Sequence, residues 1–263
     1  MSIVFCIEMV VVGCLVGTVN AALGLGGGFV MVPALREFVP GIDAHTAKGT
    51  SLFIIVFVAA LNAWRQNRGS GGVPWRVAGV LASGSILGGY AGAWFTGLLS
   101  GNAVTWIFIA LLGVMCVRLL LTEPKPPTET GKRPKDVLAF AIGLATGLAS
   151  GMAGIGGGIV LVPLVLLVGL STNERVTGLS NLVMVATCSA GAFVHLRADQ
   201  TLAMPGTVGQ VSLAVAPLIF LGAQAGSPLG RWMNEHLTFS QRKFALVTLA
   251  VVIAARMVYR ALQ

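Results

Sequence analysis

Two glycine clusters inside long apolar runs are the residues of this chain best suited to bind an anion. The sequence reads GLGGGFVMVP at residues 24–33 and GIGGGIVLVP at residues 154–163. Consecutive glycines interrupt a helix, since each costs about 1 kcal/mol of helix propensity relative to alanine. A helix that restarts after such a break presents free backbone N–H groups, and these attract negative charge. The pattern therefore favours coordination of an anion by the backbone itself.

The glycines of both clusters are the first candidate ligands. We expect that a side chain at these positions would block the N–H groups from reaching the anion. A tight helix crossing would also require glycine, and for an isolated Gly-x-x-x-Gly that interpretation is favoured. Two copies of the element, each followed by polar residues, favour a binding site instead. The candidates are Gly26, Gly27, Gly28, Gly156, Gly157 and Gly158.

Hydroxyl and amide side chains follow each cluster, at the start of the next apolar run. Thr50 and Ser51 stand in the first half of the chain, and Ser180 and Asn181 stand at the matching positions of the second half. Such groups can donate hydrogen bonds to an oxyanion, and each could equally cap a helix. Both roles stay open for Thr50 and Ser180, whereas we assign Ser51 and Asn181 to the anion.

Four further polar residues occur near these candidates. Asn20 and Ser150 occupy matching positions just before the two clusters, where they could cap a helix or contact the anion. Lys48 could attract an anion, but a lysine that extends its ammonium group to the membrane surface is the commoner arrangement. Glu8 lies inside an apolar run close to the chain start, so we expect a solvated carboxylate at the interface.

The elements that position these residues are predicted to be membrane-spanning helices. Hydrophobic residues make up 56% of the chain and charged residues 10%, whereas soluble domains carry roughly 25% charged residues. A helix needs about 20 apolar residues to cross the hydrocarbon. Runs near this length occupy residues 3–23, 49–64, 77–98, 103–121, 137–153, 176–194, 206–229 and 244–262, and shorter runs occupy 26–39 and 156–170. The fold class is therefore an all-α, polytopic transmembrane helical bundle.

The chain consists of two similar halves. A shift of 130 residues aligns the two glycine clusters with identity at seven of ten positions. Residues 1–122 form the first repeat half, residues 137–263 form the second, and a proline-rich, charged segment at 123–136 is an aqueous linker within a single transmembrane domain. Each half also carries glycines at four-residue spacing, which is typical of closely packed helices. These are Gly84, Gly88 and Gly92 in the first half, and Gly222, Gly226 and Gly230 in the second.

Two arrangements of the halves are open. They are parallel if each broken segment counts as one span, and inverted if it forms two short crossings or a re-entrant hairpin. One helix over residues 3–39 would be about 55 Å long, whereas the hydrocarbon is about 30 Å thick, and this favours inverted repeats. The inverted arrangement places the loops 66–75 and 198–204 on opposite membrane faces, which cysteines at positions 70 and 200 would reveal.

Other classes of protein are not supported by the sequence. The cysteines are scattered singly, and the histidines lack the spacing of metal ligands, so we expect no metal and no cofactor. No βαβ unit accompanies the glycines, and no constellation of His, Asp and Ser suggests an enzyme. The net charge of +8 lies mostly in short loops, where it sets orientation in the membrane. We therefore expect no nucleic-acid partner.

The duplicated Gly-x-Gly-Gly-Gly-x-x-x-Val-Pro element and the Thr-Ser-Leu sequence at residues 50–52 resemble the sulfite exporter TauE/SafE family over essentially the whole chain. The resemblance implies a secondary transporter in the cell (inner) membrane that exports small sulfur-containing anions such as sulfite or organosulfonates. The second half departs from the pattern with Ser180, Asn181 and Leu182. An anion-selective channel is the alternative function. The expected partners are a small inorganic or organic anion and the lipid bilayer, and assembly into a homo-oligomer stays open.

Overall fold

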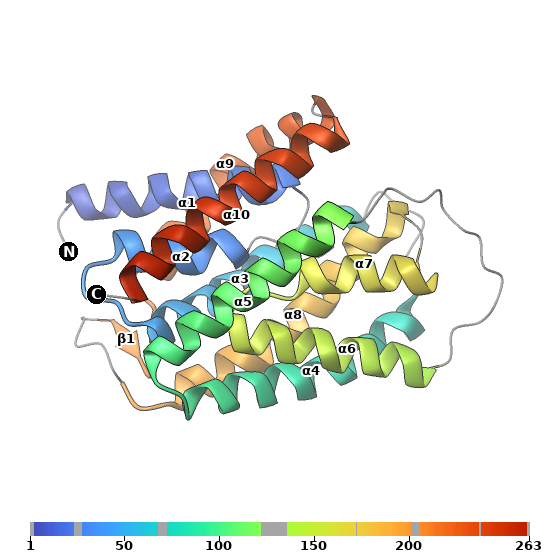
Figure 1. Cartoon of the computed structure of the whole chain (residues 1–263), viewed down its shortest axis with the longest axis horizontal. Coiled ribbons are helices and arrows are strands. Elements are labelled where there is room, and N and C mark those ends of the chain that lie inside the picture. Colours follow the sequence, from blue (N-terminus) through green and yellow to red (C-terminus); the bar gives the residue numbers. More distant parts are fainter. Residues whose placement is uncertain are drawn as a thin grey trace.

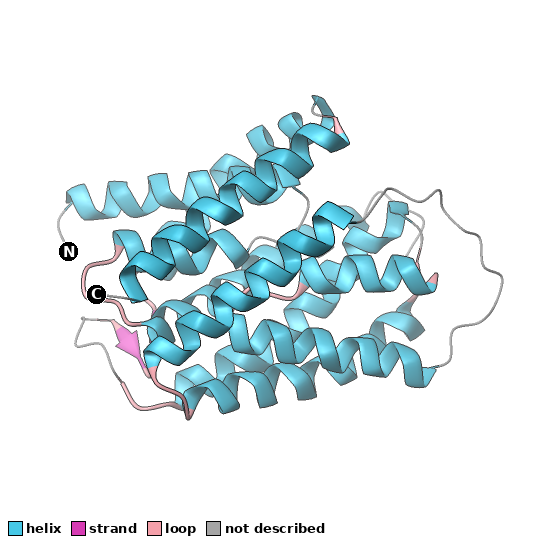
Figure 2. Cartoon of the chain, in the orientation of Figure 1, coloured by secondary structure: helices cyan, strands magenta, loops and turns pink. Residues whose placement is uncertain are grey.

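The computed structural model describes residues 3–23, 28–67, 73–121, 136–171, 173–200, 206–236 and 238–261. Within these ranges the chain is almost entirely helical, and one short hairpin supplies its strands (Figure 2). The first five helices are α1 (Ile3–Leu23), α2 (Gly28–Phe38), α3 (Ala44–Asn67), α4 (Trp75–Gly97) and α5 (Gly101–Leu121). The other five are α6 (Asp136–Ala153), α7 (Gly158–Val168), α8 (Asn173–Arg197), α9 (Ala216–His236) and α10 (Phe239–Ala261).

The helices lie roughly along one common direction, as expected of a membrane bundle (Figure 1). Helices α3 and α8 pack against each other, α1 packs along α9, and α4 packs along α6. In Figure 1, α1 and α3 run from left to right, whereas α6 and α8 run from right to left. These are the directions that the inverted arrangement of the halves requires. The duplication itself stays a prediction.

The buried apolar residues lie on both sides of the α3–α8 pair. One cluster joins α1, α2, α5, α9 and α10, and a second joins α4, α6, α7 and α8. A third cluster fills the interface of α3 and α8 with residues such as Leu52, Ile55 and Met184. Helices α2 and α7 bury Phe29 and Leu161, so one face of each short helix packs against the bundle.

Glycines spaced by four residues let two helix pairs approach closely, which confirms the packing predicted from their spacing. On α4 these glycines lie against α6, and on α9 they lie against α1. A Cβ atom at any of them would meet a backbone oxygen of the facing helix: Phe140 O, Leu144 O and Leu148 O for Gly84, Gly88 and Gly92, and Val10 O, Cys14 O and Thr18 O for Gly222, Gly226 and Gly230.

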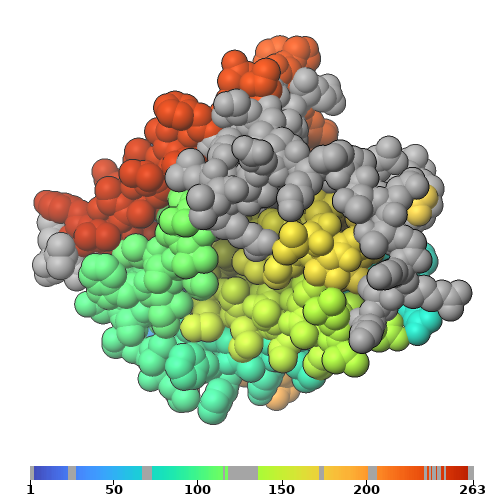
Figure 3. All heavy atoms as spheres, turned by 45° about the vertical axis from the view of Figure 1, so that its right-hand side comes forward, coloured from blue at the N-terminus to red at the C-terminus, as the bar shows by residue number. Residues whose placement is uncertain are grey.

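The outer surface of the bundle is apolar. Among the described helices, α1, α3, α4, α6 and α8 are long and apolar enough to cross a membrane. Large apolar side chains such as Leu15, Trp94, Val114 and Leu167 are exposed on several helices. Figure 3 shows one side of this surface, where α4, α5, α6 and α7 lie next to one another. An exterior of this kind is suited to lipid, because hydrocarbon solvates apolar side chains and not backbone polar groups.

The apolar run at residues 206–229 does not form one helix, so that predicted span is wrong. Its first part forms the strands β1 (Thr207–Val208) and β2 (Val211–Ser212), and α9 begins only at Ala216. Gly206 and Gly209 adopt φ angles of 80° and 58°, which suit a turn and not a helix. Val211 is fully buried. A buried hairpin is as apolar as a helix, which is why hydropathy did not separate them.

The two short helices that follow the breaks each contain a proline. Pro33 is the sixth residue of α2, and Pro163 is the sixth residue of α7. A proline beyond the first turn removes one backbone hydrogen bond of the helix. Both prolines therefore lie in the second turn of their helices, beyond the first-turn position at which a proline costs no hydrogen bond. With 11 residues each, α2 and α7 are about 16 Å long, which is about half of the hydrocarbon thickness.

Side-specific labelling should place the α3–α4 and α8–β1 connections on opposite membrane faces. Position 70 lies outside the described residues, so exposed Arg76 at the start of α4 and exposed Asp199 after α8 are better sites. In a variant without the four native cysteines, Arg76→Cys and Asp199→Cys should react with an impermeant maleimide from opposite sides. Reaction of both from the same side would exclude the inverted arrangement and support parallel halves.

Candidate functional site

The second glycine cluster forms a break between two helices. Helix α6 ends at Ala153, and α7 begins at Gly158. Between them, Gly154, Gly156 and Gly157 adopt φ angles of 74°, 77° and 80°, a region in which only glycine is free of strain. Gly26 and Gly27 of the first cluster lie outside the described residues, whereas Gly28 begins α2.

Helix α7 presents free N–H groups at its start. The N–H groups of Val160 and Leu161 donate to Gly157 O at 3.0 and 2.9 Å. Those of Gly158 and Ile159 have no backbone acceptor among the described residues, and both residues are buried. Buried backbone groups are nearly always paired, so these two donors are available to a ligand.

Two side chains of α6 that carry hydroxyl groups lie against the same break. Thr146 and Ser150 are 1% and 0% exposed, and neither hydroxyl has a nitrogen or oxygen hydrogen-bond partner among the described residues. A Cβ atom on Gly157 would lie 2.9 Å from Thr146 Cγ2 and 3.2 Å from Ser150 Cβ, so both side chains line the turn. The buried thiol of Cys188 is a hydrogen-bond partner of Ser150, but a thiol is only a weak hydrogen-bonding group.

The starts of α2 and α7 meet inside the bundle. A Cβ atom on Gly28 would collide with the backbone of Ile155, which belongs to the second break. The positive ends of two helix dipoles therefore lie close together. Asn20 near the end of α1 also has a buried carboxamide oxygen without a partner among the described residues, and it occupies the position that matches Ser150.

Ser51 lies at the second break, whereas its neighbour Thr50 faces the hairpin. Ser51 Oγ is buried and donates to Gly154 O at 2.8 Å. The polar residue of the first half thus contacts the glycine break of the second half. Thr50 Oγ1 accepts a hydrogen bond of 2.9 Å from the N–H of Ser212 in β2, which fixes the hairpin on α3.

Ser180 and Asn181 are both buried, and Asn181 makes its hydrogen bond far from the second break. Asn181 Nδ2 donates to Gln66 Oε1 at 2.9 Å. Gln66 stands 15 residues after Ser51 on α3, a rise of about 22 Å. The fold therefore does not gather all candidate ligands around one point: Ser51 and Gly156 to Gly158 come together at the second break, and Asn181 lies near the far end of α3.

The prediction that Lys48 reaches the membrane surface is wrong. Its side chain is 1% exposed, and its Nζ donates to Thr96 Oγ1 on α4. A helical pattern would have indicated this position, because Lys48, Ser51 and Ile55 follow one another at spacings that share a helix face. Ile55 and Ser51 are both buried. Glu8, in contrast, is exposed on α1.

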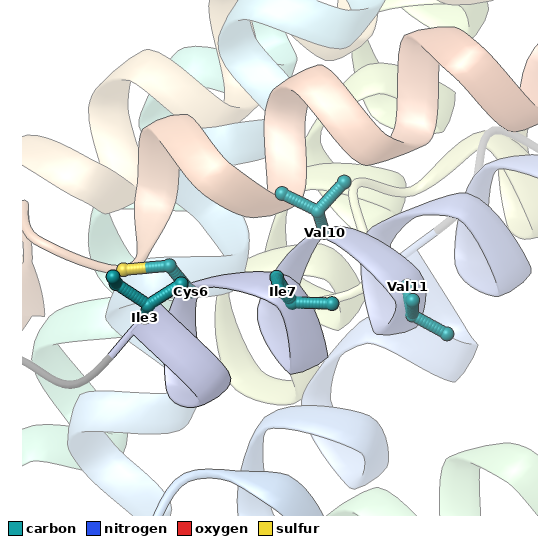
Figure 4. Close-up of a pocket in the computed structure, with 5 residues that line it drawn as sticks. All are labelled: Ile3, Cys6, Ile7, Val10 and Val11. Carbon is teal, nitrogen blue, oxygen red and sulfur yellow. The ribbon is translucent and has the colours of Figure 1, made fainter.

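A surface hollow on α1 is unsuited to an anion. It has a volume of about 330 Å³ and is lined by Ile3, Cys6, Ile7, Val10 and Val11 (Figure 4). Ile3 and Ile7 are among the most exposed apolar residues of the chain. No charged side chain lines the hollow, so it is suited to lipid chains.

Comparison with known proteins agrees with a membrane bundle of this kind. The model of the sulfite exporter TauE/SafE family matches residues 9–257. The probable membrane transporter protein YunE of Bacillus subtilis strain 168 is 23% identical, over 95% of this chain and 96% of its own length. A probable membrane transporter protein of Xylella fastidiosa strain 9a5c is 28% identical, over 90% of both chains. One from Haemophilus influenzae strain Rd is 29% identical, over 65% of this chain and 67% of its own.

No solved structure matches the chain. The family match covers nearly its entire length, and the relatives are named as membrane transporters. The apolar exterior and the long apolar helices described above are those of a multi-pass membrane protein. The chain is therefore a membrane transporter that belongs to the sulfite exporter TauE/SafE family.

Proposed function

We propose that this protein is a secondary carrier that exports small sulfur-containing anions such as sulfite or organosulfonates, and that the anion binds at the start of α7. The observation that carries the proposal is the pair of buried hydroxyls of Thr146 and Ser150, which lack a nitrogen or oxygen partner among the described residues, beside the free N–H groups of Gly158 and Ile159. Buried hydroxyls without partners are costly unless a ligand satisfies them. The family name supplies the class of anion.

The donor set is suited to a sulfite or sulfonate group. Such a group has three oxygens, each of which accepts hydrogen bonds. Two backbone N–H groups and two hydroxyls provide four donors, and the dipole of α7 adds a partial positive charge at the same point. Among the described contacts of Thr146, Ser150 and Gly157, no carboxylate competes with the anion.

Alternating access would come from the contact between the start of α2 and the second break. Gly28 at the start of α2 touches the backbone of Ile155, so the start of α2 lies next to the proposed site at the start of α7. Movement of one half against the other would then expose the anion to one membrane face at a time. The flux through a carrier of this kind reaches a maximum as the anion concentration rises. The flux through a channel is far higher.

Removing the two hydroxyls should weaken anion binding without unfolding the protein. Thr146→Val and Ser150→Ala each delete one donor to a charged ligand, worth about 1.5–3 kcal/mol, so the affinity for sulfite should fall roughly ten- to a hundredfold per substitution. Sulfite binding to purified protein and uptake of radiolabelled sulfite into proteoliposomes measure the effect. The unfolding temperature without anion should be unchanged or higher, since a hydroxyl without a partner disappears.

Thr187→Val is the matched control. Thr187 is 1% exposed, and its hydroxyl donates to Val183 O at 2.9 Å within its own helix. The same chemical change there should leave sulfite affinity as it is. Wild-type affinity in both Thr146→Val and Ser150→Ala would exclude the start of α7 as the binding site.

A further inference from the structure

Lys48 is a buried lysine with no ion-pair partner among the described residues. Its side chain is 1% exposed, and its hydrogen-bond partner is the neutral hydroxyl of Thr96. The ion pairs among the described residues are Arg76 with Asp136 and Arg256 with Glu37, and each includes an exposed arginine. An ammonium group inside a membrane protein is costly unless a counter-charge or a polar ligand compensates for it.

The side chain of Lys48 lies against the second glycine break. A Cβ atom on Gly154 would contact Lys48 Cγ and would lie 3.2 Å from Lys48 Cα. Ser51, one turn further along α3, donates to Gly154 O. Helix α3 therefore places the side-chain stem of Lys48 and the hydroxyl of Ser51 against the loop from which α7 starts.

The surroundings of Lys48 are basic and contain further polar atoms without partners. His195 on α8 and His45 on α3 both interact electrostatically with Lys48, and Asp43 interacts with both histidines. His195 Nδ1 is bonded to Gln210 Oε1 at 2.7 Å and His45 Nε2 to Leu99 O at 3.1 Å. The other ring nitrogen of each histidine is buried and has no partner among the described residues.

We propose that Lys48 is the fixed positive charge that pairs with the transported anion, which makes it the residue that selects anions over neutral solutes. This inference rests on the proposed function and adds a charged ligand to the neutral donors at the start of α7. Nζ has three hydrogens, of which Thr96 takes one. The flexible four-carbon chain lets the ammonium leave Thr96 and meet the anion at the break.

A purely structural role would be a cross-link between α3 and α4 through the bond from Lys48 to Thr96. The two roles predict opposite changes in stability. Replacing a buried charge by an apolar side chain of similar size is often neutral or stabilising when the charge has no structural partner to lose. A needed cross-link would make the same replacement destabilising, and Thr96→Val would then be as harmful as the loss of Lys48.

The deciding experiment compares Lys48→Met, Lys48→Arg and Arg76→Met in detergent. Thermal unfolding is recorded with increasing sodium methanesulfonate, a probe that stays a monoanion over the working pH range, and with sodium sulfite. Ligand that binds the folded state raises the unfolding temperature, so the titration yields an affinity. Lys48→Met should bind both anions about a hundredfold more weakly, and Lys48→Arg should retain most of the affinity.

Arg76→Met is the control, because it removes one positive charge from an exposed surface pair and should leave affinity at the wild-type value. In the absence of anion, Lys48→Met should unfold at or above the wild-type temperature. Wild-type anion affinity in Lys48→Met, or an unfolding temperature lowered equally by Lys48→Met and Thr96→Val, would overturn the assignment. If Thr146→Val and Ser150→Ala still lose affinity in that case, the proposed function stands and only the role of Lys48 fails.

Discussion

Gly88→Ala should prevent α4 and α6 from packing, and little folded protein should be recovered. A Cβ atom at Gly88 would collide with Leu144 O and would lie 2.7 Å from Leu148 N. Both obstacles are backbone atoms of the facing helix, so no side chain can rotate away. Overpacking that side chains can absorb costs about 1–3 kcal/mol. We expect a larger loss here, which is a large part of a typical folding free energy of about 5–15 kcal/mol.

Gly79→Ala in the same helix is the matched control. No atom lies within 4 Å of a Cβ added at Gly79. Alanine is the better helix former, so this variant should be more stable by about 0.5–1 kcal/mol. Yield of monodisperse protein and the unfolding temperature in detergent measure both changes. Equal stability of the Gly79 and Gly88 variants would show that the helices do not cross as closely as described.

Gly157→Ala should lower both the unfolding temperature and the affinity for sulfite. Gly157 has a φ angle of 80°, and forcing another residue into this region costs roughly 1–2 kcal/mol. The new Cβ would also lie 2.9 Å from Thr146 Cγ2. A glycine is therefore required at this position by the backbone itself, whether or not an anion binds. Loss of stability alone would not argue against the binding site, so affinity has to be measured on the folded fraction.

Two further variants separate backbone strain from contact with the site. Gly41→Ala places alanine at a φ angle of 72° with no atom within 4 Å of the new Cβ, so it should lose stability and keep its affinity. Thr146→Ser removes Cγ2 and retains the hydroxyl, so in the Gly157→Ala background it should restore part of the stability. Sulfite affinity at the wild-type value in Gly157→Ala would mean that the anion does not contact this turn.

Much of the fold follows from the sequence, because lipid constrains it strongly. Backbone groups in hydrocarbon must be paired within the chain, so long apolar runs have little choice but to form helices. The run at residues 3–23 corresponds to α1 residue for residue, and the glycines at four-residue spacing on α4 and α9 mark the close crossings. The hairpin at residues 207–212 was not predicted in this way, since its strands pair with each other and thereby satisfy their backbone hydrogen bonds as a helix would.

The candidate site, too, was predicted only in part from the sequence. The glycine cluster and the paired positions of Asn20 and Ser150 are visible in the sequence, because three consecutive glycines are unfavourable in a helix and the cluster occurs twice at a shift of 130 residues. Which polar side chains meet the break is a matter of contacts between helices that lie far apart in the chain. Only the tertiary structure placed Ser51 and Lys48 against Gly154 and turned Thr50 toward β2.

The sequence by itself determined that this protein is a helical membrane transporter of a known family, and it indicated the glycines that separate α6 from α7. It did not determine the surroundings of Lys48, because a lysine near a helix end can reach water or be buried, and the choice depends on what covers it. Thr96, Gly154 and His195 come from α4, the second break and α8. Their convergence on α3 results from packing, which decides where a charge is shielded from solvent.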